Sequence, residues 1–336
     1  MKNNKILISD ATLRDGNHAI SHQMTEKQIE SYCLAADIAG VPIVEVGHGN
    51  GLGASSLQVG ESLVDDITML TIARKNLKKS RLGIHVIPGF ATIENDLKPA
   101  MKCGVDVFRI ASHCTEADIT ESHIRFCKME GKTVFGVLMM SHMASKEVLS
   151  DEANKMQEYG AEAVILMDSS GNYLPDDVTE KVSFLEENLN ISVGFHAHNN
   201  LGMAISNSVA AIKSGATIVD GCSRGFGAGA GNAQLEVLVA VLQRMGYDLG
   251  IDLYKMLDAS DIAERDLIKK LPTIGSTSIV SGLSGVFSGY LRPVIRIASE
   301  FSIDPRDLFF ELGRRKVVAG QEDLIIDVAS EMSKEN

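Results

Sequence analysis

Short apolar runs recur along the chain, and a longer stretch of helical periodicity follows each of them. The runs are continuous rather than alternating, which is typical of strands buried on both faces of a parallel sheet. Stretches such as Thr25–Ala39 and Ser145–Tyr159 have the length of helices, and Thr25 with Gln28 predicts a capping box. The predicted strands are Lys5–Ser9, Ile43–Val46, Gly83–Ile87, Val105–Ile110, Thr133–Leu138, Ala163–Met167, Ile191–Phe195 and Thr217–Val219.

Eight strands, each followed by a helix, predict a closed (β/α)₈ TIM barrel, with an open doubly wound sheet as the alternative. We expect the barrel to occupy residues 1–245. Residues 246–336 have no apolar runs of comparable strength and predict a C-terminal helical subdomain. No low-complexity linker separates the two parts, so we expect the subdomain to pack tightly on the barrel.

Composition narrows the class of protein. The net charge of −12 argues against nucleic acid or an anionic membrane as a partner, because both require clustered Lys and Arg. The basic run Arg74–Arg81 lies in a helical pattern and is interpreted as a solvated face. No apolar stretch approaches the roughly 20 residues needed to span a bilayer. The five cysteines are odd in number and lack CxxC spacing, which predicts free thiols and a cytoplasmic location.

Unusual polar residues follow the predicted strands. In a TIM barrel the C-terminal ends of the strands meet at one mouth, where the chemistry takes place. Charged groups directed into such a mouth are costly unless they bind something. These residues are Asp10–His18, Glu45 with His48, His85, Arg109 with Ser112, Asp168–Ser170, His196–Asn200 and Gly225–Asn232.

His196 and His198 are the most specific element. Two residues apart on an extended chain, their rings point to the same side and suit a divalent metal. An HxH pair alone is often only hydrogen-bonded, but Asp15 supplies a third ligand from another strand end. Two histidines and one carboxylate with open positions suit Mn²⁺, Fe²⁺, Co²⁺ or Mg²⁺ better than a closed zinc site.

Neighbouring polar residues each allow two interpretations. Arg14 could form a surface ion pair or clamp an oxyanion beside the metal. His18 could cap its loop or act as a general base. Asp168 could fix loops by hydrogen bonds or orient Arg14. The glycine-rich segment Gly225–Asn232 could cradle a phosphate or form a tight turn that brings Asn232 to the metal.

Taken together, these residues resemble the barrel metallolyases named for an Asp-Arg-Glu-type motif after the first strand. Within that superfamily the chain is most similar to the 4-hydroxy-2-oxovalerate aldolases. His18 and the Gly-His-Gly segment point to the aldolases, and the similarity covers nearly the whole chain. The matching stretches are Ile8–Ile20, Glu45–Gly53, Asp168–Gly171, Phe195–Leu201 and Gly227–Asn232.

The resemblance implies retro-aldol cleavage of a 4-hydroxy-2-oxoacid to pyruvate and a short aldehyde. It implies metal ligation by Asp15, His196 and His198, with Mn²⁺ expected and Mg²⁺ or Co²⁺ as alternatives. His18 would be the base, Arg14 would stabilise the enolate, and Ser169 would help to hold the carboxylate. It also implies assembly into a homo-oligomer, or into a hetero-oligomer with an acylating aldehyde dehydrogenase.

The sequence departs from the aldolase pattern at Phe287, where the aldolases carry a tyrosine in a Gly-Val-Tyr-Ser motif. Tyr290 lies three residues further on, so we expect its hydroxyl to reach the site from the same helix face, unless a water takes that role. Asn17 and Ser21 also differ from the residues more common around the base. These changes predict an altered choice of hydroxy-oxoacid or aldehyde.

Two other functions remain open. A Claisen-type synthase of the isopropylmalate or citramalate type would need a basic coenzyme-binding surface, but the basic residues near the C-terminal end are scattered. A non-catalytic metal-binding barrel that partners another enzyme would explain Phe287. Against it stands the cluster of metal ligands with Arg14 and His18, which only chemistry requires.

Overall fold

The computed structural model describes residues 5–335 and contains a closed barrel of eight parallel strands in the order β1 to β8. β1 pairs with β2 on one side and with β8 on the other, Leu7 lying opposite Ile218. This closure excludes the open doubly wound sheet and confirms the predicted TIM barrel. The strands are β1 Leu7–Leu13, β2 Ile43–Val46, β3 Arg81–Val86, β4 Val107–His113, β5 Thr133–Met139, β6 Ala163–Asp168, β7 Ser192–Ala197 and β8 Ile218–Gly221.

β1 extends four residues beyond the predicted end at Ser9, because its polar residues find partners inside the protein. Asp10 and Thr12 are buried. The Asp10 carboxylate accepts hydrogen bonds from the Thr12 amide at 2.9 Å and the Tyr32 hydroxyl at 2.6 Å. A buried polar group that is fully hydrogen-bonded is compatible with a strand interior.

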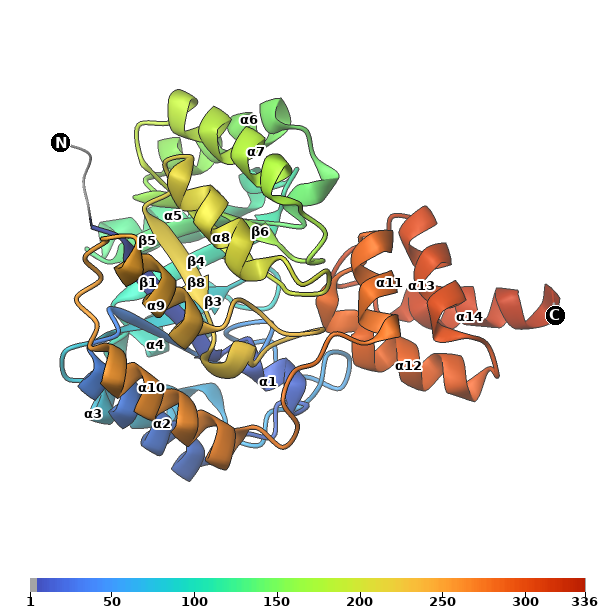
Figure 1. Cartoon of the computed structure of the whole chain (residues 1–336), viewed down its shortest axis with the longest axis horizontal. Helices are drawn as coiled ribbons and strands as arrows, with labels where there is room; N and C mark the ends of the chain where they lie inside the picture. The colour runs from blue at the N-terminus through green and yellow to red at the C-terminus, as the bar shows by residue number, and fades with distance from the viewer. Residues whose placement is uncertain (1–4, 336) are drawn as a thin grey trace.

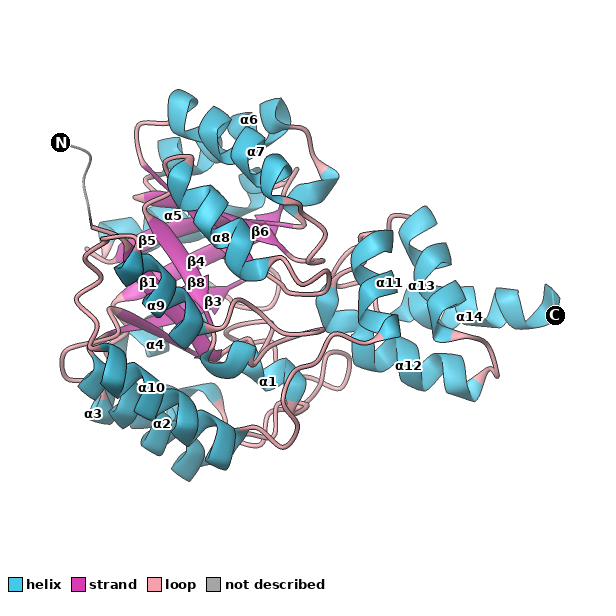
Figure 2. Cartoon of the chain, viewed as in Figure 1, coloured by secondary structure: helices cyan, strands magenta, loops and turns pink. Residues whose placement is uncertain are grey.

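Helices surround the strands (Figure 2). The predicted capping box is confirmed: the Thr25 hydroxyl accepts from the Gln28 amide, and the Gln28 side chain accepts from the Thr25 amide. Gly40 ends the same helix with φ of 81°, a conformation that favours glycine. The barrel helices are α1 Gly16–Ala19, α2 Glu26–Ala39, α3 Asp66–Asn76, α4 Lys98–Lys102, α5 Glu121–Met129, α6 Lys146–Tyr159, α7 Pro175–Asn188, α8 Ala204–Lys213, α9 Leu235–Arg244 and α10 Leu253–Ile262.

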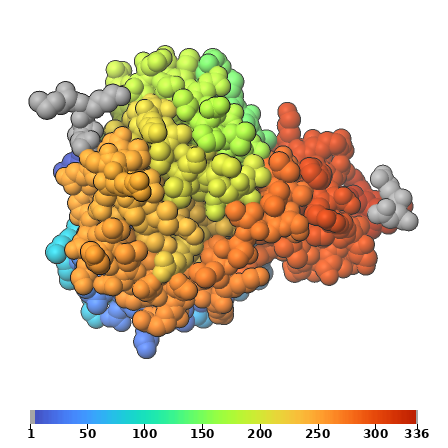
Figure 3. All heavy atoms as spheres, in the orientation of Figure 1, coloured from blue at the N-terminus to red at the C-terminus, as the bar shows by residue number. Residues whose placement is uncertain are grey.

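The last four helices form a smaller lobe that projects from the barrel (Figures 1 and 3). This lobe has its own buried core, which includes Val286, Val294 and Phe309, and Met140 from the barrel packs into it. α10 lies beyond residue 245 but packs on the barrel helix α2. The predicted boundary after residue 245 stays a prediction. The lobe contains α11 Ser276–Ser284, α12 Leu291–Glu300, α13 Pro305–Arg314 and α14 Asp323–Glu335.

Backbone contacts attach the lobe to the mouth of the barrel. The Ser288 amide donates to the Ser169 carbonyl at 2.9 Å, directly after β6. Ala319 packs against the apolar layer at the barrel mouth that includes Met139 and Met167. Across residues 5–335, no helix combines the length and the hydropathy that a bilayer crossing demands.

Candidate active site

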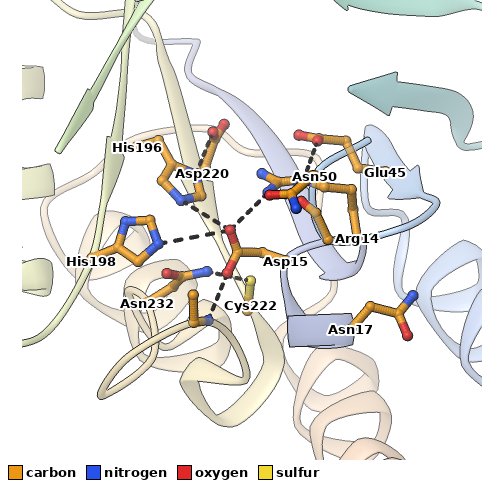
Figure 4. A network of polar contacts seen from close by, with 12 residues as sticks. Arg14, Asp15, Asn17, Glu45, Asn50, His196, His198, Asp220, Cys222 and Asn232 are labelled. Atoms are coloured by element: carbon orange, nitrogen blue, oxygen red, sulfur yellow. Dashed lines mark hydrogen bonds and ion pairs between the residues drawn. The ribbon is translucent and has the colours of Figure 1, made fainter. Parts of the chain in front are cut away.

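Asp15, His196 and His198 meet at the C-terminal ends of the strands (Figure 4). Asp15 follows β1, His196 lies within β7, and His198 follows it. Their ligand atoms all lie within 4.8 Å of one another, and all three side chains are buried. Asp15 Oδ2 is 3.9 Å from His196 Nε2 and 3.8 Å from His198 Nε2. The structure therefore brings the three predicted ligands together.

The outer nitrogen of each histidine is fixed by an acceptor. His198 Nδ1 lies 2.9 Å from the Asp168 carbonyl, and His196 Nδ1 lies 2.9 Å from Asp220 Oδ2. Because a carbonyl or carboxylate oxygen can only accept, each Nδ1 carries the proton and each Nε2 presents a lone pair. Both Nε2 atoms are buried without a hydrogen-bond partner. Two unpartnered imidazole nitrogens beside a carboxylate fit a divalent metal.

The protonation states of Asp15 and His198 also suit a bound divalent metal. Burial opposes ionisation of Asp15, but Arg14 and the neighbouring histidines together outweigh it, and the pKa of Asp15 lies well below its usual range. Asp15 Oδ2 accepts from Arg14 at 2.8 Å, and Oδ1 accepts from the Ala228 amide at 2.8 Å. Burial lowers the pKa of His198 to about 3, so its imidazole is neutral and able to bind a cation.

Beneath the triad lies a buried network of charges. Arg14 Nε donates to Glu45 Oε2 at 3.2 Å, and Arg109 forms ion pairs with Glu45 and with Asp220, the latter at 2.6 Å. Arg14 has one guanidinium nitrogen that is buried without a partner. That nitrogen is available to an oxyanion beside the triad.

His18 lies on α1, near the triad. Its ring is 5.3 Å from that of His22 and 6.2 Å from that of Phe287. Burial lowers the pKa of His18, which leaves the imidazole neutral and able to take a proton. A side chain on Gly49 would meet three atoms of this ring within 2.7 Å, so this glycine makes room for it. Asn17 ties the same helix to the loop after β2 by donating to the Gly47 carbonyl at 2.7 Å.

The hydroxyl of Tyr290, which the sequence predicted to reach the active site, forms its hydrogen bonds with the backbone of the C-terminal lobe. It donates to the Val318 carbonyl at 2.7 Å and accepts from the Gln321 amide at 3.0 Å. The expectation assumed that residues 287 and 290 share a helix face. In the structure Phe287 has an extended ψ of 126°, and only a short 3₁₀ turn follows it. The ring of Phe287 instead packs against both His18 and Tyr290.

Asp168 fixes its own loop. Its carboxylate accepts from the amides of Asn172 and Tyr173 at 2.9 and 3.2 Å, and burial raises its pKa to about 6. The hydroxyl of Ser169 accepts from the Met140 amide at 2.9 Å, which leaves its proton free to donate elsewhere.

The glycine-rich segment forms a tight turn against the triad. Besides the bond from Ala228 to Asp15, the Ala230 amide donates to the Asn200 side chain at 2.8 Å. Asn232 pairs with His198 through a β-bridge, and its side-chain oxygen is buried without a partner. Of the two interpretations of the sequence, these contacts favour the turn.

Sequence reasoning missed the role of Asp220 and the ion pairs of Arg109. The signal was present, because Glu45, Arg109 and Asp220 stand inside apolar runs, where a charge must find a partner.

Comparison with known proteins agrees with this geometry. The HMGL-like family model matches residues 5–263. A protein of Spirochaeta aurantia named 4-hydroxy-2-oxovalerate aldolase is 68% identical over 97% of this chain and 96% of its own length. The chain belongs to the 4-hydroxy-2-oxovalerate aldolase family. Another member, from Pectobacterium atrosepticum, is 60% identical over 99% of this chain and 97% of its own.

Membership of this family confirms the predicted enzyme class, a carbon–carbon lyase whose family depends on a divalent metal. It argues against the Claisen-type synthase and the non-catalytic barrel. Residues 272–334 match the DmpG-like communication domain.

Solved structures share the fold at lower identity. The N-terminal domain of a putative aldolase from Bacteroides vulgatus superposes with a TM-score of 0.73 at 24% identity, over 86% of this chain and 96% of that one. The carboxyl transferase domain of Rhizobium etli pyruvate carboxylase superposes with a TM-score of 0.82 at 15% identity, over 99% of this chain and 61% of that one.

Proposed function

We propose that this aldolase cleaves 4-hydroxy-2-oxovalerate, or a close 4-hydroxy-2-oxoacid, to pyruvate and a short aldehyde. The observation that carries the proposal is the pair of buried, unpartnered Nε2 atoms 3.8 and 3.9 Å from Asp15, with a neutral imidazole at His18 nearby. The printed names of the relatives supply the substrate class.

Asp15, His196 and His198 would hold the metal, Mn²⁺ with Mg²⁺ or Co²⁺ as alternatives. A bound divalent metal supplies Lewis-acid polarisation of the 2-oxo group. The free nitrogen of Arg14 donates to the oxygen on which negative charge develops as the enolate forms. The hydroxyl of Ser169, with its proton free, helps to bind the carboxylate.

His18 takes the proton from the 4-hydroxyl group, the C3–C4 bond breaks, and its electron pair enters the enolate. The aldehyde leaves, and the proton on His18 is then available to C3 of the enolate, which gives pyruvate. This sequence needs no tyrosine, in agreement with the bonds that occupy Tyr290.

We further propose that the aldehyde passes to an acylating aldehyde dehydrogenase bound to the C-terminal lobe, whose sequence matches a communication domain. A cavity of about 380 Å³ lies between the barrel mouth and this lobe. Its lining includes apolar Met139, Ile119, Val318 and Ala319, which suit a neutral aldehyde. Co-expression with such a dehydrogenase, followed by gel filtration, tests the assembly.

Variant His18→Gln tests the role of the base. We expect pyruvate release to fall by about 10²–10⁴-fold, as is typical of a lost acid–base group, while the protein binds Mn²⁺ as the wild type does. A variant that keeps full activity would remove His18 from the mechanism. A variant that loses metal as well would place His18 among the groups that build the metal site.

A further inference from the structure

A second cavity opens directly onto His18. It has a volume of about 190 Å³ and is separate in its lining from the apolar cavity at the barrel mouth. Its lining includes His18 and Gly227–Gly229, the turn that holds Asp15. The segment Lys270–Thr273 and Arg292 also line it. Figure 1 shows this segment passing α1 on its way from α10 to the C-terminal lobe.

The charge of this cavity is positive and uncompensated. Lys270 and Arg292 line it, and no acidic residue does. Arg292 donates to the Ser21 hydroxyl at 2.8 Å and to the Ala19 carbonyl, both neutral acceptors. Lys270 is exposed, and among residues 5–335 it has no hydrogen bond or ion pair. In a chain with a net charge of −12, two cations without a carboxylate partner produce a local positive potential.

Arg292 lies close enough to the base to act on it. Burial lowers the pKa of His18 most, Asp15 raises it, and Arg292 adds a smaller lowering. The apolar cavity differs in sign, because Glu116 and Glu322 line it. The cavity over His18 therefore attracts an anion, and the apolar cavity at the barrel mouth repels one. A neutral molecule has no electrostatic preference for either cavity.

We propose that the cavity over His18 is the route by which the 2-oxoacid anion enters and the pyruvate anion leaves, with Lys270 and Arg292 attracting the carboxylate. The inference rests on the proposed aldolase reaction. It assigns a function to Lys270, a residue far from the metal ligands in sequence, and it separates the path of the anions from that of the neutral aldehyde.

Variants Lys270→Gln and Lys269→Gln form a matched pair. Both remove one positive charge from adjacent exposed residues, but only Lys270 lines the cavity. At an ionic strength of about 0.01 M, where the Debye length is about 30 Å, we expect Lys270→Gln to lower kcat/KM about threefold. Lys269→Gln should keep the wild-type value. Near 1 M, where screening acts within about 3 Å, the difference should vanish.

Lys270→Glu extends the series. Charge reversal should lower kcat/KM further, and added salt should raise it rather than lower it. Equal kcat/KM values for the Lys270 and Lys269 variants at every ionic strength, with an active wild type, would overturn the proposed route. A metal-loaded wild type that releases no pyruvate would instead overturn the proposed reaction.

Discussion

Replacing Asp220 by Asn should weaken metal binding without unfolding the protein. Asp220 Oδ2 accepts from His196 Nδ1 at 2.9 Å and from Arg109 at 2.6 Å, while Oδ1 is buried without a partner. An Asn oxygen can occupy the Oδ2 position and keep both hydrogen bonds. The variant therefore removes mainly the negative charge of Asp220. In the wild type this charge raises the basicity of His196 and, together with Glu45, balances the charge of Arg109.

Loss of such an outer partner typically weakens metal binding by about 10–100-fold, or roughly 1.4–2.7 kcal/mol. Calorimetric titration with Mn²⁺ measures this change. Asp37→Asn is the matched control, because Asp37 is also a buried carboxylate. It accepts from the amides of residues 78–80, before β3, at the opposite end of the barrel. The reasoning is refuted if Asp220→Asn binds Mn²⁺ as tightly as Asp37→Asn does.

Three further predictions concern the surroundings of the site. Gly49→Ala places a methyl group about 2.6 Å from the His18 ring, so kcat should fall about 100-fold while metal binding stays intact. The control Gly275→Ala adds a methyl group in open space and should leave kcat unchanged. Tyr290→Phe should lower the free energy of unfolding by about 1–3 kcal/mol, but not the rate of pyruvate release; a 10²-fold slower rate would restore Tyr290 as the proton donor. Burial lowers the pKa of His142 to about 4, so below pH 6.5 the unfolded chain binds a proton that the folded protein does not. Between pH 6.5 and 4, denaturant titrations should show the wild type losing stability more steeply than His142→Gln, by up to about 1.4 kcal/mol per pH unit, and parallel curves would contradict the assignment.

The barrel was predictable because its strands are apolar runs of regular spacing, and the metal triad because strand ends converge in such a fold. Arg14, Asp15 and His198 follow a strand, and His196 lies one residue before the end of one, so the topology brings them together.

The remaining errors come from information that the sequence carries only through tertiary contacts. The apolar run around Asp220 indicates that this carboxylate needs a partner, but only closure of the barrel places it beside His196 and Arg109. The direction of the Tyr290 side chain depends on the extended backbone of Phe287, which a helical spacing rule does not anticipate.

The most direct test of the central claim is the release of pyruvate from racemic 4-hydroxy-2-oxovalerate by the purified protein, with Mn²⁺ present and then with a chelator. The account predicts pyruvate and aldehyde in equal amounts, and loss of both when the metal is removed. Absence of pyruvate from folded protein that has Mn²⁺ bound would contradict it.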